Sequence, residues 1–206
     1  MFTGIVQSKK KIISVKRSPG LMQLWVDLGE TEGLSIGASV AINGTCLTVV
    51  AISEQGVQFD LIQETLSLTN LELIHEGDFV NIERAAKVGD EIGGHLVSGH
   101  IHTTARIQEK RSSENNLAIH LALDKQWQDY VIYKGFICVD GASLTVGQLS
   151  ESGFWLHLIP ETLRTTTLGD KKVNDLVNIE IDSSTQTVID TLKHLMSNGD
   201  IKRWLN

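Results

Sequence analysis

The feature that most constrains the fold is an internal repeat that covers most of this 206-residue chain. Three blocks occur twice, and equivalent positions are always separated by 97 residues. The paired blocks are GASVAINGTCLTV (37–49) with KGFICVDGASLTV (134–146), FDLIQETLSLTNL (59–71) with LHLIPETLRTTTL (156–168), and GDFVNIE (77–83) with NDLVNIE (174–180). One unbroken offset over three blocks indicates a duplication. Because the unit is much longer than a solenoid repeat, each copy should be a small domain with its own core.

Each copy has the pattern of β-structure. Residues 39–52 are rich in Val, Ile and Thr and are divided by Asn43-Gly44, a dipeptide typical of two-residue hairpin turns. Asp140-Gly141 takes the same place in the second copy. Further strands are expected at 57–62, 78–84, 153–159 and 175–181, and the two ETL segments should form short helical turns. Short strands with frequent turn signals favour a small antiparallel barrel or sandwich.

The end of the chain, residues 184–206, belongs to neither repeat. Ser184 or Thr185 is expected to cap a helix here. Its apolar residues at helical spacing are Val188, Ile189, Leu192, Leu195 and Met196. Such a helix needs an apolar partner, which is either its own barrel or another subunit, and the pattern alone leaves both open.

Composition excludes several classes of protein. The formal net charge is −7, and no basic cluster suggests nucleic-acid binding, since the run of lysines at 9–11 fits a solvated strand face. No stretch approaches the roughly 20 apolar residues of a membrane span, and the first residues do not resemble a signal peptide. Cys46 and Cys138 are too few for a disulfide framework and lack zinc-like spacing. We therefore expect a cytoplasmic protein with reduced thiols.

Two similar barrels suggest two similar pockets for two copies of one ligand. The repeats nevertheless differ at three pairs of positions that could give the two ligand molecules separate roles. These pairs are Cys46 with Ser143, Gln63 with Pro160, and Asn43 with Asp140.

Four motifs carry a family resemblance. They are MFTGIVQ (1–7), NGTCLTV (43–49), NIERAAKVGDEIGGHLVSGHI (81–101) and LIPETLRTTTLG (158–169). Together they resemble the riboflavin synthase family, which also includes non-catalytic lumazine proteins, and the match runs to about Asp190. The resemblance implies a mostly β fold with two six-stranded Greek-key barrels and a C-terminal α-helix. The expected boundaries are 1–96 and 97–186 for the barrels and 187–206 for the helix.

The same resemblance implies an activity. Two molecules of 6,7-dimethyl-8-ribityllumazine would dismutate by transfer of a four-carbon unit, giving riboflavin and 5-amino-6-(ribitylamino)pyrimidinedione. No cofactor and no metal is implied. The implied assembly is a homotrimer held partly by the helix, with each active site between the first barrel of one subunit and the second barrel of another.

The implied substrate-binding residues fall into two groups. The first-barrel pocket matches Gly4, Ile5, Val6, Ser39, Cys46, Leu47, Thr48, Asp60, Leu61, Ile62, Gln63, Glu64 and Thr65. The second-barrel pocket matches Gly99, His100, Ile101, Lys134, Ser143, Leu144, Thr145, His157, Leu158, Ile159, Pro160, Glu161 and Thr162. Backbone groups and hydroxyls at strand ends can pair with the pyrimidine edge, while the Glu64 and Glu161 segments can meet the ribityl hydroxyls.

The reaction needs a proton removed from a C7 methyl group and two rings held face to face. His95 and His100 are the favoured proton-transfer residues, because the family motif has histidines there, whereas His102 lies outside it. Cys46 is a candidate nucleophile or pocket wall. Ser143 and Asp182 complete the catalytic candidates, although a simple strand-end carboxylate explains Asp182 about as well. Structural roles are expected for the remaining candidates, which are His75, His120, His194 and the core residue Cys138.

Three other functions compete with this interpretation. The first is a lumazine- or flavin-binding protein of the same fold without turnover, but the motifs around Cys46 and His100 and both ETL segments are intact. The second is an adaptor with no pocket, which leaves the strand-end Cys, Ser, His and Thr pattern unexplained. The third is a flavoprotein oxidoreductase, for which no Gly-rich phosphate loop is present.

Overall fold

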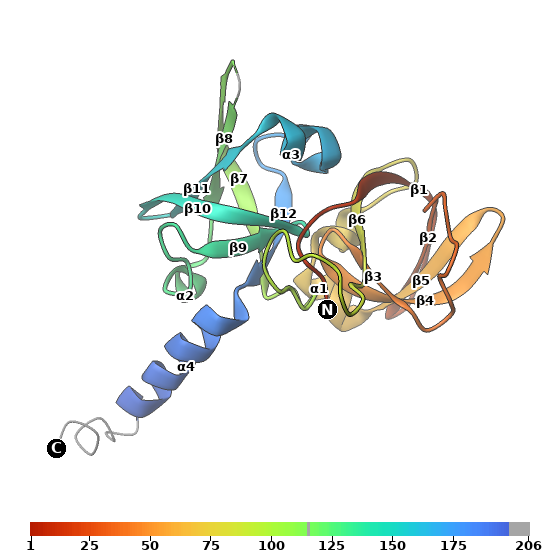
Figure 1. Cartoon of the computed structure of the whole chain (residues 1–206), viewed down its shortest axis with the longest axis horizontal. Helices are drawn as coiled ribbons and strands as arrows, with labels where there is room; N and C mark the ends of the chain where they lie inside the picture. Colours follow the sequence, from red (N-terminus) through yellow and green to blue (C-terminus); the bar gives the residue numbers. More distant parts are fainter. Residues whose placement is uncertain (115, 198–206) are drawn as a thin grey trace.

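The computed structural model describes residues 1–114 and 116–197, and the two repeats form two closed β-barrels that lie side by side (Figure 1). The first barrel consists of β1 (Ser8–Ser18), β2 (Leu21–Val26), β3 (Ser39–Ile42), β4 (Thr45–Ser53), β5 (Gly56–Ile62) and β6 (Phe79–Arg84). The second consists of β7 (Thr103–Ser113), β8 (Asn116–Ala122), β9 (Phe136–Val139), β10 (Ala142–Ser150), β11 (Gly153–Leu158) and β12 (Leu176–Ile181). The helical elements are α1 (Gln63–Leu68), η1 (Asn70–Leu73), α2 (Lys125–Gln128), α3 (Pro160–Thr165), η2 (Thr167–Gly169) and α4 (Ser183–Ser197).

Both barrels have the same Greek-key strand order. The first runs β1-β2-β5-β4-β3-β6, and the second runs β7-β8-β11-β10-β9-β12 around its closed sheet. In each, three strands joined by hairpins are followed by a fourth that returns beside the first of them. The predicted barrel architecture and the short helices α1 and α3 at the ETL segments are therefore confirmed.

The hairpin dipeptides form the tight turns that their sequences predict. Asn43 and Gly44 have φ of 46° and 78°, and Asp140 and Gly141 have φ of 45° and 85°. Two successive positive φ values are typical of a type I′ turn, whose twist matches that of the flanking strands. Each turn therefore fixes the register of the hairpin that carries the Cys46 or Ser143 position.

The two barrels have separate hydrophobic cores. Phe59 is fully buried in the first core and Phe154 in the second. Val6 precedes the first barrel in sequence but is packed in the core of the second. Its position shows that the N-terminal segment crosses between the barrels.

The barrels meet at a buried contact that follows the internal symmetry. Gly44 and Gly141 touch so closely that a Cβ on Gly44 would lie 2.6 Å from the Gly141 amide nitrogen. Asn81 donates its side-chain amide to Asp140 O, and Asn178 donates its own to Asn43 O, each at 2.8 Å. The backbone amides of Asn81 and Asn178 in turn donate to the side chains of Asn43 and Asp140. Each hairpin turn is therefore hydrogen-bonded to both barrels.

A small apolar cluster extends this contact. Phe2 and Val97 form an antiparallel bridge, and they pack with Ala41 and Cys138 between the barrels. The sequence prediction that Cys138 is a core residue is confirmed, since its side chain is buried.

Helix α4 begins at Ser183 and extends away from both barrels (Figure 1). The expected cap at Ser184 or Thr185 is wrong, because Asp182 Oδ1 accepts the Thr185 amide and hydroxyl at 2.8 and 2.9 Å. A carboxylate is a strong helix cap, and its negative charge is stabilised by the positive end of the helix dipole. Residues 198–206, the end of the predicted helix, lie outside the described residues.

Polar contacts hold α4 to its own second barrel. Gln186 bonds His102 at 3.0 Å, Tyr130 donates to Asp190, and Lys193 pairs with Asp129 at 3.0 Å. The apolar residues Val188, Leu192 and Met196 are exposed.

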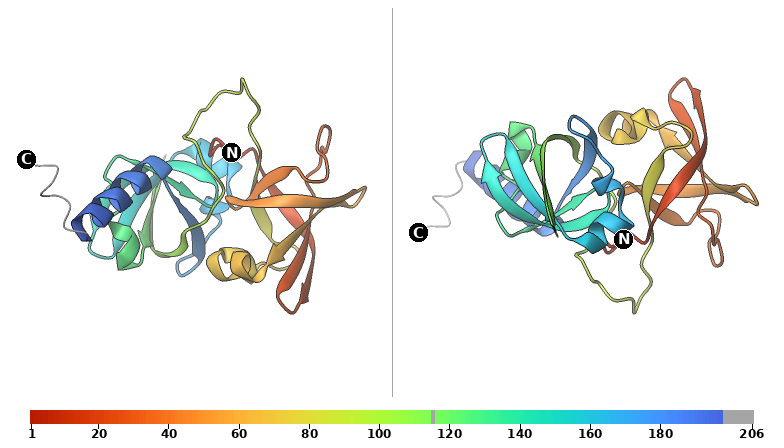
Figure 2. Two further views of the ribbon diagram at one scale, coloured as in Figure 1. Left: turned by 90° about the horizontal axis from the view of Figure 1, so that it is seen from below. Right: turned by 90° about the horizontal axis from the view of Figure 1, so that it is seen from above.

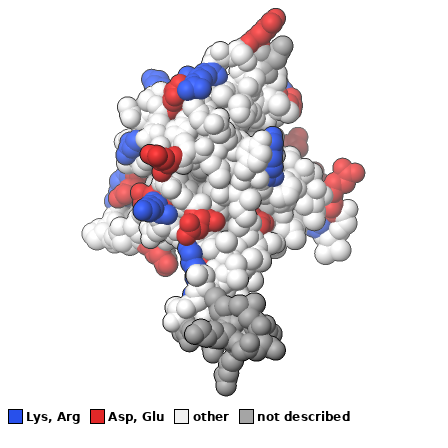
Figure 3. All heavy atoms as spheres, turned by 90° about the vertical axis from the view of Figure 1, so that its left-hand side faces the viewer, with Lys and Arg blue, Asp and Glu red and all other residues white. Residues whose placement is uncertain are grey.

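The segment that joins the two barrels arches outward in both views of Figure 2. Basic and acidic side chains are interspersed on the face of Figure 3, where no patch of one sign stands out. Among the residues described, no helix is both long and apolar enough to cross a membrane.

The contact between the two turns predicts a specific sensitivity to added side-chain volume. Gly44→Ala should lower the free energy of unfolding more than Gly20→Ala, because both glycines have positive φ but nothing lies within 4 Å of a Cβ at Gly20. The φ strain should cost about 1–2 kcal/mol at either position, and overpacking at Gly44 about 1–3 kcal/mol more. Urea denaturation of the two variants measures the difference, and equal losses would contradict a close turn contact.

Candidate active site

The two glycine segments of the expected site cross to opposite barrels. Gly4 O accepts the Ser143 amide of the second barrel at 2.7 Å, and Gly99 O accepts the Cys46 amide of the first barrel at 2.9 Å. Both glycines have positive φ, 72° and 85°, and each packs on the β-carbon of its partner. An added Cβ would lie 2.6 Å from Ser143 Cβ or 2.5 Å from Cys46 Cβ, so only glycine fits at either position.

Gly4 and Gly99 therefore each lie against the barrel opposite to the one whose pocket the resemblance implies for them. Residues 4–6 were assigned to the first-barrel pocket and 99–101 to the second, yet each lies against the other barrel. The reason is the bridge between Phe2 and Val97. It pairs the segments that precede the two barrels, and it does so at the interface between the barrels. Each candidate pocket is consequently built from both repeats.

Two buried carboxylates that the sequence analysis missed hold these segments. Glu83 Oε1 accepts the Thr3 amide at 2.6 Å and its hydroxyl at 2.8 Å, while Oε2 accepts the Gly4 amide at 3.1 Å. Glu180 binds Ser98 and Gly99 with the same pattern, at 2.7, 2.6 and 3.0 Å. Burial raises the pKa of Glu83, and the hydrogen bonds from Thr3 oppose that shift. The signal in the sequence was the acidic residue that ends both NIE blocks.

His95 and Ser143 form the closest pair of predicted catalytic side chains. His95 Nδ1 lies 2.6 Å from Ser143 Oγ, and the imidazole stacks on Phe136 with ring centroids 5.0 Å apart. The His95 amide donates to Thr3 O at 3.1 Å. Gly94 allows this approach, because a Cβ there would lie 2.3 Å from Thr3 O and 2.7 Å from Ser143 Cβ.

Burial controls the protonation of His95. Desolvation lowers its pKa below the ordinary value of 6.5, and the negative charge of Asp182 acts in the opposite direction. The imidazole is therefore neutral near pH 7 and can exchange a proton with the Ser143 hydroxyl in either direction, according to its tautomer. Asp182 thus combines a structural role, the cap of α4, with an electrostatic effect on His95.

The other two histidines of this motif are placed differently. Residues 100–102 precede β7, so His100 and His102 lie in the segment that leads into the second barrel and not on a strand. His100 is exposed, and its amide donates to Ser98 Oγ at 3.1 Å. His102 accepts the Ile181 amide through Nδ1 and bonds Gln186 through Nε2, which makes it a link between the second barrel and α4.

Several residues expected to bind substrate have side chains inside the barrels. Those buried in the cores are Val6, Leu47, Leu61 and Leu158, and Leu144 packs partly against the second core. The four buried residues therefore have only their backbone groups available to a ligand, whereas Leu144 keeps part of its side chain exposed.

Most of the remaining expected residues have exposed or partly exposed side chains. Ile62 and Ile159 occupy equivalent positions and are 56% and 61% exposed, so each repeat presents an apolar side chain at its surface there. The exposed members of the expected set are Ile5, Thr48, Asp60, Gln63, Glu64, Lys134, Thr145, His157, Pro160 and Glu161, and those partly exposed are Ser39, Thr65, Ile101 and Thr162. Lys134 has a positive φ of 65°, and Glu161 pairs with Arg164. These side chains are accessible to a ligand or to another subunit.

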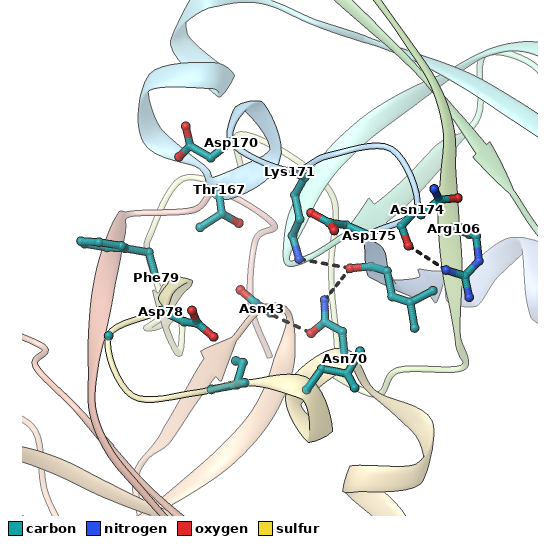
Figure 4. A pocket seen from close by; sticks show the side chains of 14 residues that line it. Asn43, Asn70, Asp78, Phe79, Arg106, Thr167, Asp170, Lys171, Asn174 and Asp175 are labelled. Carbon is teal, nitrogen blue, oxygen red and sulfur yellow. Dashed lines mark hydrogen bonds between the residues drawn. The ribbon is translucent and has the colours of Figure 1, made fainter.

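A cavity of about 720 Å³ lies elsewhere, between the η1–β6 and η2–β12 segments (Figure 4). Asn43, Asn70, Thr167 and Lys171 line it together with ten further residues, none of which belongs to the expected site. It is part of the interface between the barrels. Within the described residues no group of three or more His, Cys, Asp or Glu side chains is arranged to hold a metal ion.

Comparison with known proteins places these features in context. The family described as "Lumazine binding domain" matches twice, at residues 3–85 and 98–182. Riboflavin synthase of Escherichia coli (strain K12) is 52% identical over 200 residues, which cover 96% of this chain and 94% of that protein. Riboflavin synthase of Bacillus subtilis (strain 168) is 36% identical over 183 residues, which cover 88% and 85%.

Solved structures agree in fold. LumP in complex with riboflavin superposes with a TM-score of 0.83 at 24% identity, covering 89% of this chain and all of that chain. LumP in complex with 6,7-dimethyl-8-(1'-D-ribityl) lumazine gives a TM-score of 0.81 with the same coverage.

The position of Asp182 predicts how the His95 pKa responds to substitution. Asp182→Asn should lower the pKa of His95 further, because it removes the negative charge that favours the imidazolium while an amide oxygen still caps α4. Histidine NMR titration measures the shift, and His95→Asn identifies the signal.

This pKa shift also determines how stability depends on pH. A folded state that keeps His95 neutral binds fewer protons than the unfolded chain. His95 therefore lowers the free energy of unfolding as the pH falls below about 6.5 and has no such effect above it.

For the Asp182→Asn variant, a higher pKa of His95 would contradict the electrostatic role of Asp182.

Proposed function

Because this chain belongs to the riboflavin synthase family, a family of transferase enzymes, we propose that it converts two molecules of 6,7-dimethyl-8-ribityllumazine into riboflavin and 5-amino-6-(ribitylamino)pyrimidinedione. One molecule gives up a four-carbon unit and the other receives it, so the atoms balance without an added oxidant or reductant. Support comes from the duplicated lumazine-binding family match and from the 52% identity to a riboflavin synthase over 96% of the chain.

The two substrate molecules would occupy the two pockets around Cys46 and Ser143. Each pocket is formed by one barrel and by a glycine segment of the other repeat. Backbone amides and strand-end hydroxyls, such as those of Thr48 and Thr145, can pair with the pyrimidine edge of a lumazine. Holding two rings in a fixed mutual orientation is the main contribution that a protein can make to a reaction between two molecules of one substrate.

We propose that the Ser143 pocket carries the proton transfer. The observation that supports this most directly is the 2.6 Å contact between His95 Nδ1 and Ser143 Oγ. A neutral imidazole is able to take up the proton released from the acidic C7 methyl group, directly or through the Ser143 hydroxyl. The charge of Asp182 would then stabilise the imidazolium that forms. His100 and Cys46 are assigned to substrate contact in this scheme.

We propose that the active unit is a homotrimer in which each complete site lies between subunits. Val188, Leu192 and Met196 form an exposed apolar stripe on α4, spaced by one helical turn. The exposed side chains of Ile62 and Ile159 would also be covered by another subunit. A cytoplasmic location fits the two free thiols, Cys46 and Cys138.

The second candidate is a lumazine- or flavin-binding protein without turnover. It is favoured by the fold similarity to LumP, but that similarity has only 24% identity and supports the fold alone. The two candidates differ in one measurement, which is riboflavin formation.

The test of the proposed reaction follows product and substrate together. Metal-free protein incubated with 6,7-dimethyl-8-ribityllumazine should form riboflavin at half the rate of lumazine loss, with no added cofactor. His95→Asn should lower kcat by about 10²–10⁴-fold, which is the usual contribution of a general acid or base. His75→Asn is a suitable control, because His75 lies on the surface beside Asp78. Lumazine binding without turnover in the unsubstituted protein would support the carrier function instead.

The trimer proposal predicts the effect of charge on the apolar stripe of α4. The double variant Val188→Glu/Leu192→Glu should reduce the molar mass from that of a trimer to that of a monomer, because six carboxylates would be brought together. Multi-angle light scattering measures the mass. Thr187→Glu places one charge on another exposed side of the helix and should leave the trimer intact. A trimer that survives the double variant would contradict the role of this stripe.

A further inference from the structure

Two buried carboxylates have no part in the chemistry described above. Glu83 ends the NIE block of the first repeat on β6, and Glu180 ends that of the second on β12. Both are 4% exposed, and both face the interface between the barrels. Within the described residues neither forms an ion pair, and each carboxylate accepts its hydrogen bonds from neutral donors.

Each carboxylate uses both oxygens on one short segment. Glu83 receives three donors from Thr3 and Gly4, and Glu180 receives three from Ser98 and Gly99, with all six distances between 2.6 and 3.1 Å. Hydrogen bonds to an ionised acceptor are stronger than those between neutral groups, and burial strengthens them further. We call each set of three bonds a carboxylate clamp.

Each clamp is connected to a pocket residue through one more hydrogen bond. The glycine held by Glu83 accepts the Ser143 amide through its carbonyl, and the glycine held by Glu180 accepts the Cys46 amide in the same way. The clamped Thr3 also accepts the amide of His95. The Glu83 clamp therefore reaches the Ser143 and His95 positions, and the Glu180 clamp reaches Cys46.

The connection crosses between the repeats. Glu83 belongs to the first barrel but holds a segment that packs on the second, and Glu180 does the reverse. The glycine segment beside each pocket is therefore held by a carboxylate of the other barrel, and not by the barrel that supplies most residues of that pocket.

We propose that Glu83 and Glu180 are positioning residues, each of which orients the substrate pocket of the opposite barrel by clamping the glycine segment that lies against it. The inference rests on the proposed function, since the pockets are those assigned above to the two lumazines. The two clamps act separately, with Glu83 serving the Ser143 pocket and Glu180 serving the Cys46 pocket.

A glutamine cannot reproduce either clamp. Its one carbonyl oxygen can accept from part of the set, but its amide group would place a donor against the glycine N–H. The variants Glu83→Gln and Glu180→Gln keep the size of the side chain and remove the charge, so they release the segment without leaving a cavity.

The first measurement is the reactivity of Cys46 towards an aromatic disulfide reagent, dithiobis(nitrobenzoate). Cys46 is partly exposed and Gly99 covers its β-carbon, whereas Cys138 is buried and reacts only when the barrels unfold. In Glu180→Gln the rate of Cys46 modification should rise about tenfold or more, as expected when charge-assisted hydrogen bonds that close a segment are lost. In Glu83→Gln, a matched change at the equivalent site, the Cys46 rate should stay within about twofold of the unsubstituted protein.

The second measurement is the reciprocal one, the imidazole NMR signal of His95. Glu83→Gln should shift this signal and move the pKa of His95 towards its ordinary value, because the Thr3 segment that covers it is released. Glu180→Gln should leave it unchanged. Both variants should lower kcat for riboflavin formation by about 10–100-fold, since a displacement of about 1 Å costs this much.

The crossed pattern separates positioning from general stability. If both variants changed Cys46 and His95 alike, or if neither changed them, the proposal would be overturned. Modification of Cys138 would show that a variant had unfolded. In that case Ser98→Ala, which removes only one donor from Glu180, is the milder variant. It should raise the rate of Cys46 modification by a smaller factor. The thiol and NMR results do not depend on turnover, so failure of the lumazine assay would leave them interpretable.

Discussion

The arrangement of this protein depends on one buried contact, the approach of the turns Asn43-Gly44 and Asp140-Gly141 across the internal symmetry axis. Backbone can meet backbone there only because both second turn residues are glycines. The polar groups that this contact buries are satisfied by Asn81 and Asn178, whose amides reach across to the opposite turn. With the turns in contact, the ends of β6 and β12 also lie at the interface, which is where their glutamates are needed.

The contact determines how the candidate site is assembled. Each repeat begins with a segment that cannot stay beside its own barrel, because Phe2 and Val97 pair with one another at the interface. Gly4 consequently lies on Ser143, and Gly99 lies on Cys46. The surroundings of Cys46 and of Ser143 are thus each built from both repeats.

The two halves of the interface are no longer equivalent. In the first repeat Asn43 donates its side-chain amide to Asn70 at 3.3 Å. The corresponding atoms of the second repeat, Asp140 Oδ2 and Thr167 Oγ1, have no hydrogen-bond partner within the described part of the chain. Burial raises the pKa of Asp140, and Lys171 at 3.4 Å from Oδ2 opposes that shift. The two repeats therefore differ in the groups that they place beside this cavity, which Asn43, Asn70, Thr167 and Lys171 line.

The sequence by itself determined the duplication, the strands of the repeated blocks and the type of hairpin turn, because periodicity, Asn-Gly or Asp-Gly signals and repeated motifs are local properties. The pattern left a barrel or a sandwich open, and the resemblance of the motifs to a family favoured two barrels. It also predicted His95, Ser143, Cys46 and Asp182 as catalytic candidates, and the structure places His95 and Ser143 in contact. Only the tertiary structure decided that residues 4–6 and 99–101 exchange barrels, that Asp182 caps α4, and that Glu83 and Glu180 hold the exchanged segments. These features depend on which surfaces of the two repeats meet, and a contact between residues about 80 positions apart leaves no periodic signal in the chain.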